Sequence, residues 1–258
     1  MFSTGTFLFA ALAAVVSAAP PCPPPGPPNS TVNYTLPSIG GGAPDLLPPA
    51  DNLVVKKIAV GHGIQNYTCG SSTTGDSIAA GAVAVLYDVT SFYPGTKRTG
   101  IRKDLWDSLP SRALWEQPLP LNRLAGSRFG ADPVAPFPAN PAADLRLRGL
   151  PAAARFLGHH YFDIDGVPTF DLPAAAAGGL RAAVARVDSE SAPATADKGV
   201  LATGAVPWLR LDDNGRGGSR GVASVFRVVT AGGNPQSCSV AGEGVQSIPY
   251  AAFYWFYG

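Results

Sequence analysis

The sequence carries little charge, and neither sign predominates. Only 14% of its 258 residues are charged, with 19 Lys and Arg against 18 Asp and Glu. Such a chain lacks the basic surface to which nucleic acid or an anionic membrane binds, so we expect neither as its main partner. Beyond the first residues no apolar run reaches about 18 residues, the length that spans a bilayer, so we expect no integral membrane segment in the mature chain.

A dinucleotide-binding turn is also missing. The nearest approach is residues 215–221 (GRGGSRG), where the third glycine comes one place late and no acidic ribose partner follows. A nicotinamide site needs its glycine turn between a strand and a helix, so that the helix end meets the pyrophosphate. Because the residues that follow have the composition of a strand, we expect a hairpin loop here and no NAD-dependent dehydrogenase.

Cysteine is scarce as well, with three residues in the chain. In an oxidising compartment the simplest pairing joins Cys69 to Cys238 and leaves Cys22 over. Pairing of Cys22 with either of the other two stays open, because sequence alone does not fix connectivity. A Cys69–Cys238 bridge would leave no reactive thiol near His62.

The first residues indicate secretion. Residues 6–16 (TFLFAALAAVV) form a short apolar core that is followed by small residues, as in a signal peptide cut after Ala18. We therefore expect a signal peptide at 1–18, a proline-rich disordered tail at 19–50 and a single β-rich domain at 51–258. The expected location is extracellular or at a cell wall.

Three glycosylation sequons agree with this location. They begin at Asn29, Asn33 and Asn66, and each reads Asn-x-Ser/Thr. Behind a signal peptide such sequons become plausible acceptor sites for glycans, so we expect a glycoprotein.

Short β-type segments, bounded by Gly, Pro, Asp or Asn, run through the expected domain. Residues 104–115 have helical spacing that Pro110 interrupts, and residues 118–151 form a long proline-rich stretch expected to be irregular. The pattern favours a mainly β fold, an antiparallel sandwich or barrel with few short helices. The expected strands are residues 54–60, 64–69, 83–89, 159–162, 169–172, 180–187, 208–211, 223–230 and 250–257, with a turn at 61–63 and a helix as the alternative for 180–187.

The last of these segments is apolar on both faces. Tyr250, Tyr254 and Phe256 would point one way, and Phe253 and Trp255 the other. A strand of this kind must be covered on both sides, so we expect it to be central in its sheet.

Five blocks of the sequence resemble, in order and spacing, the domain-of-unknown-function family 3455, found in bacteria and in secreted fungal proteins. The resemblance implies a fold and a fungal or bacterial extracellular setting, but no reaction, and the malate dehydrogenase label of some members has no support in these residues. Phe170 replaces a family tryptophan, and His160 aligns with the family histidine. The blocks are GIQNYTC (63–69), GHHYF with PTF (158–162 and 168–170), VPWLRL (206–211), VFRVVTAGG (225–233) with Pro235 and Cys238, and PYAAFYWFY (249–257).

The histidines and nearby aspartates are the candidate metal or ligand residues. His62 and His160 would converge if their strands paired, and Asp163 or Asp165 could complete an open divalent-metal site. The competing interpretation is a hydrogen-bonded structural histidine beside a turn, and we expect no cofactor on that interpretation.

Aromatic side chains are the candidate sugar-stacking residues. Trp208, Tyr254 and Trp255 could stack on a glycan, although in a β-rich domain such residues also build the core. The leading hypothesis is a secreted, non-catalytic protein that binds a cell-wall glycan or a surface protein. The alternative is a metal- or carboxylate-dependent enzyme that acts on polysaccharide.

Overall fold

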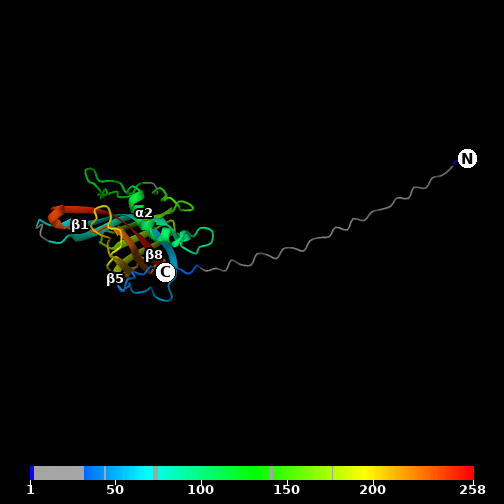
Figure 1. Ribbon diagram of the computed structural model, residues 1–258, viewed down its shortest axis with the longest axis horizontal. Coiled ribbons are helices and arrows are strands. Elements are labelled where there is room, and N and C mark those ends of the chain that lie inside the picture. Colours follow the sequence, from blue (N-terminus) through cyan, green and yellow to red (C-terminus); the bar gives the residue numbers. More distant parts are fainter. Residues whose placement is uncertain (3–31, 44, 72–74, 140–141, 176) are drawn as a thin grey trace. The chain divides into compact units, whose positions relative to one another are not determined.

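Eight antiparallel strands close into a barrel in which each strand pairs with its neighbours in sequence and β8 pairs back with β1 (Figure 1). The computed structural model describes residues 1–2, 32–43, 45–71, 75–139, 142–175 and 177–258. The mainly β prediction is confirmed, and the barrel form replaces the sandwich alternative. The strands are β1 (Val55–Cys69), β2 (Ile78–Asp88), β3 (Arg155–Phe162), β4 (Pro168–Leu172), β5 (Leu180–Glu190), β6 (Trp208–Asp213), β7 (Ser224–Gly232) and β8 (Gly244–Tyr257).

Alternation along the strands builds two cores, one inside the barrel and one outside it. All eight strands contribute to an inner cluster that includes Tyr250, Tyr254 and Phe256 of β8. The intervening residues Phe253 and Trp255 belong to an outer cluster, which the helices and loops cover. The strand β8 is paired on both sides and buried on both faces. Its two apolar faces therefore indicate a central strand, as expected.

The turn expected at residues 61–63 does not exist, because β1 runs through it without interruption. The two glycines serve packing instead. A Cβ on Gly61 would lie 2.5 Å from Cε2 of Tyr254, and one on Gly63 would lie 2.0 Å from the carbonyl oxygen of Val83. Glycine in a strand interior can mark such a close approach as well as a turn, and only the tertiary structure distinguishes the two.

Replacement of Gly63 by alanine is expected to destabilise the protein by about 3 kcal/mol or more. Overpacking against side chains, which can move, costs about 1–3 kcal/mol. The methyl group added at Gly63 would meet the backbone of β2, which cannot move as easily. Gly70→Ala is the matched control, because nothing lies within 4 Å of its Cβ position. Urea denaturation of both variants measures the difference. Equal midpoints would contradict the packing role of Gly63.

Two short helices, α1 (Lys103–Asp107) and α2 (Leu109–Glu116), lie between β2 and β3. The helical segment breaks near Pro110 as expected, but at Ser108, and Pro110 stands in the first turn of α2, where its missing N–H is not needed. A 3₁₀ turn, η1 (Thr90–Phe92), precedes them, and α3 (Cys238–Ala241) precedes β8. Figure 1 shows α2 and the neighbouring green loop segments on one side of the strands.

The described part of residues 118–151 contains isolated β-bridges but no helix or strand, which confirms the irregular excursion. Leu121, Leu145 and Leu147 of this excursion are buried in the outer core. The excursion therefore covers the outside of the barrel.

The chain before β1 also packs on the barrel. Residues from Val32 onward belong to the same compact unit as the strands, whereas a disordered tail was expected up to residue 50. The ring of Tyr34 lies 5.0 Å from that of Tyr93, and Leu46 is 7% exposed. Buried aromatic and aliphatic side chains outweigh the local preference of proline for a solvated chain. The expected cleavage site at Ala18, Cys22 and Asn29 lie outside the described residues.

Candidate functional site

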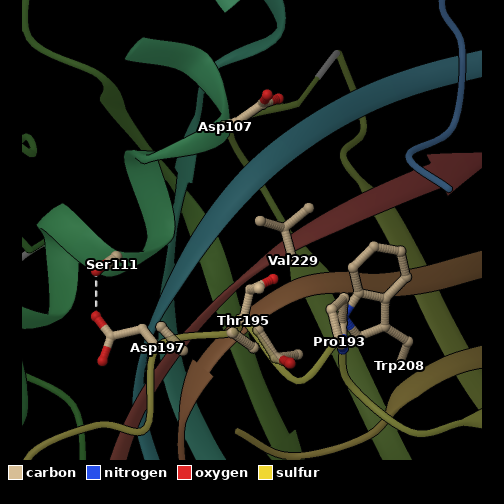
Figure 2. A pocket seen from close by; sticks show the side chains of 10 residues that line it. Asp107, Ser111, Pro193, Thr195, Asp197, Trp208 and Val229 are labelled. Atoms are coloured by element: carbon tan, nitrogen blue, oxygen red, sulfur yellow. Dashed lines mark hydrogen bonds between the residues drawn. The ribbon is translucent and has the colours of Figure 1, made fainter. Parts of the chain in front are cut away.

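A pocket of about 320 Å³ lies on the outer wall of the barrel, against β6 and β7. We call it the Trp208 pocket. Side chains from the two helices, from the loop before β6 and from the two strands surround it, as Figure 2 shows. Its lining residues are Asp107, Ser111, Pro193, Thr195, Ala196, Asp197, Trp208, Val229, Thr230 and Ala231.

Asp197 fixes one wall of this pocket. One carboxylate oxygen accepts hydrogen bonds from the Ser111 hydroxyl and from the Trp115 indole, the latter at 2.7 Å. The other oxygen accepts from the backbone N–H of Gly199 at 2.9 Å. With both oxygens engaged, Asp197 ties the loop to α2. Figure 2 shows the bond to Ser111.

The floor of the pocket contains a strained backbone. The register of β7 against β8 shifts between Val228 and Ala231, so a bulge interrupts the ladder. Val229 in this bulge has φ +49°, an uncommon conformation for a β-branched residue. Bulges and strained residues of this kind occur preferentially at functional sites. The Thr230 hydroxyl donates to the carbonyl oxygen of Val206 at 2.6 Å and holds the bulge in place.

Trp208 lines the pocket and carries a buried polar group. The side chain is 4% exposed, and its indole N–H is buried without a hydrogen-bond partner among the described residues. In Figure 2 the ring nitrogen lies on the side of Pro193. A buried donor without a partner is costly, so a ligand that accepts a hydrogen bond here would satisfy it. With so little exposure the ring offers its edge and not a full stacking face.

The two candidate histidines do not converge. His62 pairs with Val85 of β2, whose side chain belongs to the outer core, while His160 pairs with Ala84, whose side chain belongs to the inner core. Directly opposed residues share a face of the sheet, so the two imidazoles lie on opposite sides of the barrel wall. The hypothesis of one metal site that uses both is wrong for this reason.

Each histidine has its own buried setting. Burial lowers the pKa of His62 to about 4. Burial, together with the nearby Arg227 guanidinium, lowers the pKa of His160 to about 4, against the opposing effect of a 2.9 Å hydrogen bond to the Thr169 carbonyl oxygen. His62 lines a cavity of about 190 Å³ beneath the excursion, beside Tyr87 and Asp144.

Asp163 and Asp165 shape the turn between β3 and β4. A carboxylate oxygen of Asp163 accepts from the backbone N–H groups of Asp165 at 3.0 Å and Val167 at 2.8 Å. This is the local hydrogen bonding expected of aspartate in a turn. Among the residues that the structure describes, no group of three or more His, Cys, Asp or Glu side chains could hold a metal ion.

Of the three candidate stacking residues, only Trp208 lines a pocket. Tyr254 is 1% exposed in the inner core and Trp255 is fully buried in the outer core. The alternation of β8 decides their role, and both are packing residues.

Cys69 and Cys238 form a disulfide, with their Cα atoms 5.5 Å apart. It joins the end of β1 to the start of α3. The pairing predicted from the cysteine count is present, and the Cys69 sulfur is not a nucleophile beside His62.

The two described sequon asparagines differ in setting. Asn33 is exposed, whereas Asn66 is half-buried within β1 and accepts a 2.8 Å hydrogen bond from Ser247. Asn66 also lines an outer groove of about 540 Å³ with Leu124 and Val245.

The glycine-rich residues 215–221 connect β6 to β7, as the hairpin prediction required. Gly217 to Gly221 also have the Gly-x-Ser-x-Gly spacing of a nucleophile elbow, a signal that the sequence contains. An elbow joins a strand to a helix. Ser219 instead donates to Asp213 at 2.7 Å in a strand-to-strand loop, so it is a structural residue.

A family model described as "Protein of unknown function (DUF3455)" matches residues 49–258. The chain belongs to this family. No curated protein and no solved structure gave a significant match. No helix within the described residues combines the length and the apolar character required to cross a membrane. The DUF3455 match covers every strand of the barrel and every residue of the Trp208 pocket.

Proposed function

We propose that the protein is a secreted, non-catalytic binding protein that acts at a cell wall or another extracellular surface, and that the Trp208 pocket binds a hydroxyl-rich ligand such as a glycan unit. The single observation that carries this proposal is the buried indole N–H of Trp208, which has no hydrogen-bond partner among the described residues and belongs to a side chain that lines a pocket of about 320 Å³. The Cys69–Cys238 disulfide supports an oxidising, extracytoplasmic setting.

The chemistry of the lining suits a sugar. The indole N–H donates to a ligand hydroxyl, the exposed Thr195 hydroxyl both donates and accepts, and the exposed Asp107 carboxylate accepts. Pro193 and Val229 supply apolar surface for the C–H face of a pyranose ring. Small ligands are held by this combination of an apolar wall and a few placed polar groups.

Trp208→Phe keeps an aromatic ring and removes only the indole N–H and part of the ring. We expect the affinity for a bound oligosaccharide to fall by about five- to tenfold, the equivalent of one neutral hydrogen bond. Isothermal titration of the purified domain against a panel of soluble wall oligosaccharides measures the change.

Trp255→Phe is the matched control, because its indole N–H is also buried without a hydrogen-bond partner among the described residues, and Trp255 does not line the pocket. It should leave the affinity unchanged. An equal loss of affinity in both variants would mean that the substitutions act through protein stability and not through the pocket. A wild-type protein that binds no member of the panel would refute the glycan proposal.

A further inference from the structure

Asn66 lies on the outer face of the barrel, near the end of β1. Burial alternates from Gln65 to Cys69, so Asn66 and Thr68 share the partly exposed outer face, while Tyr67 between them is buried. Asn66, Tyr67 and Thr68 form a sequon, which in a secreted protein is an acceptor for a glycan. Because this sequon is in a strand and not in a loop, the surroundings of Asn66 decide whether a glycan fits there.

The side-chain amide of Asn66 is held by its oxygen. The Oδ1 atom accepts a 2.8 Å hydrogen bond from the Ser247 hydroxyl on β8. The Nδ2 atom donates to none of the residues that the structure describes, and it is not one of the buried side-chain atoms that lack a partner, so solvent reaches it. The bond to Ser247 therefore orients the amide and leaves accessible the atom to which a glycan attaches.

A groove of suitable size adjoins this amide. Asn66 lines the outer groove of about 540 Å³, which is within the range of about 300–1,000 Å³ that small-molecule pockets have. A second hollow of about 230 Å³ shares Ser127, Val245 and Ser247 with it, so the groove continues past Val245 toward Phe129. The two together have room for the first sugars of an attached chain.

The lining combines exposed apolar side chains with a polar group. Val245 is 72% and Leu124 is 44% exposed, and exposed apolar residues that gather in a groove mark a binding surface. Asp132 accepts the backbone N–H groups of Val134 and Ala135 through Oδ1, at 2.8 and 3.1 Å. Its Oδ2 accepts no hydrogen bond from the described part of the chain, so it can accept one from a sugar hydroxyl. This lining suits a pyranose, which has a C–H face and hydroxyl edges.

We propose that Asn66 carries an N-linked glycan whose first sugars lie in the outer groove and form part of the folded surface. The attached chain is the occupant that this position favours, because its first sugar is bonded directly to Nδ2 of a side chain that lines the groove. The inference rests on the secretion that the proposed function requires, but not on any ligand of the Trp208 pocket.

The sugar comes from a lipid-linked oligosaccharide diphosphate of the secretory pathway. The bond between C1 of its first sugar and the diphosphate oxygen breaks, and a bond between C1 and Nδ2 of Asn66 forms. The lipid diphosphate leaves, and one amide proton passes to solvent. Transfer to the nascent chain precedes the synthesis of β8, so neither Ser247 nor Val245 obstructs it. The glycan is then already attached when β8 pairs with β1 and completes the groove.

The first test is deglycosylation of the full chain, expressed in yeast and recovered from the medium. Peptide-N-glycosidase is applied to the folded and to the denatured protein, and mass spectrometry follows release at Asn66 and at the exposed Asn33. Release from the folded protein should be slower at Asn66 than at Asn33 by about tenfold or more, because the enzyme reaches a glycan in the groove only when the structure opens locally. After denaturation the two rates should be equal. If Asn33 is unmodified, the denatured protein supplies the reference rate.

The second test is a pair of variants that leave Asn66 and its bond to Ser247 unchanged. Thr68→Val destroys the sequon, whereas Thr68→Ser keeps it. From yeast, Thr68→Val should have a Tm lower than that of Thr68→Ser by about 2–4 °C, the shift that a modest loss of stability causes in a domain of this size. Valine is the better strand former, so strand propensity would act in the opposite direction. Made without glycosylation in a bacterial periplasm, Thr68→Val should lose this disadvantage.

An unmodified Asn66 in protein from the medium overturns this inference and leaves the proposed function standing. A glycan released from folded protein as fast as from denatured protein also overturns it, as does an equal Tm for the two variants from yeast. Protein that stays in the cytosol would contradict secretion itself. Oligosaccharide binding to the Trp208 pocket is a separate measurement, so its failure leaves the Asn66 glycan unaffected.

Discussion

Acidification from pH 7 to pH 4 is expected to lower the free energy of unfolding by roughly 6 kcal/mol, with about 3 kcal/mol from each of His62 and His160. Both have a folded-state pKa of about 4 against an ordinary value of 6.5. Between these values the unfolded chain binds protons that the folded chain does not. The stabilisation is therefore complete above pH 6.5 and is lost progressively as the pH falls toward 4.

Urea denaturation at a series of pH values checks this expectation. His62→Gln and His160→Gln should each remove about half of the decrease in unfolding free energy between pH 7 and pH 4. This holds even if the variants are also less stable than the wild type at pH 7. The groups near His62 are Tyr87 and Asp144, which line the same cavity, and those near His160 are Arg227 and Tyr254. A wild-type protein equally stable at pH 7 and pH 4.5 would show that these imidazoles titrate normally.

Removal of the disulfide is expected to cost about 5 kcal/mol, because Cys69 and Cys238 are separated by 169 residues and the bridge restricts a very large loop in the unfolded chain. The double variant Cys69→Ala/Cys238→Ala avoids a new free thiol in the barrel. Chemical denaturation of the double variant, compared with the wild type, measures the loss.

Cys22→Ala is the control for this prediction, since it leaves the bridge between Cys69 and Cys238 intact, and it should not change the midpoint. A double variant within about 1 kcal/mol of the wild type would mean that the unfolded chain is already compact without the bridge.

The strands could be predicted because their signals are local. The alternation along β8 predicted that Tyr254 and Trp255 lie on opposite faces. Because each apolar face must be covered, the strand was expected to be central, between two partner strands. The same periodicity could have found Arg227, a lone charged residue that shares a face with Val225 in an otherwise apolar run. A charge at a core-facing position indicates that the interior of the barrel is not wholly apolar.

The parts that could not be predicted depend on contacts between distant segments. The glycines on either side of His62 resemble a turn in the sequence. The reason that glycine is required there, close contact with the Tyr254 ring and with the β2 backbone, is visible only in the folded structure. The Trp208 pocket requires α2, residues 193–197 and the β7 bulge to meet, and no local pattern predicts a positive φ at Val229. Sequence reasoning identified Trp208 as a candidate but not the residues around it.

The pairing of β1 with β8 has a consequence for the order of folding. The ring of strands cannot close until the final strand has been synthesised, although its partner is made first. Contacts between such distant segments form slowly, because the intervening chain must first lose its freedom. Until β8 has been synthesised, β1 lacks the aromatic residues of its partner strand and remains exposed. Incompletely folded molecules are therefore prone to associate through β1 during this time.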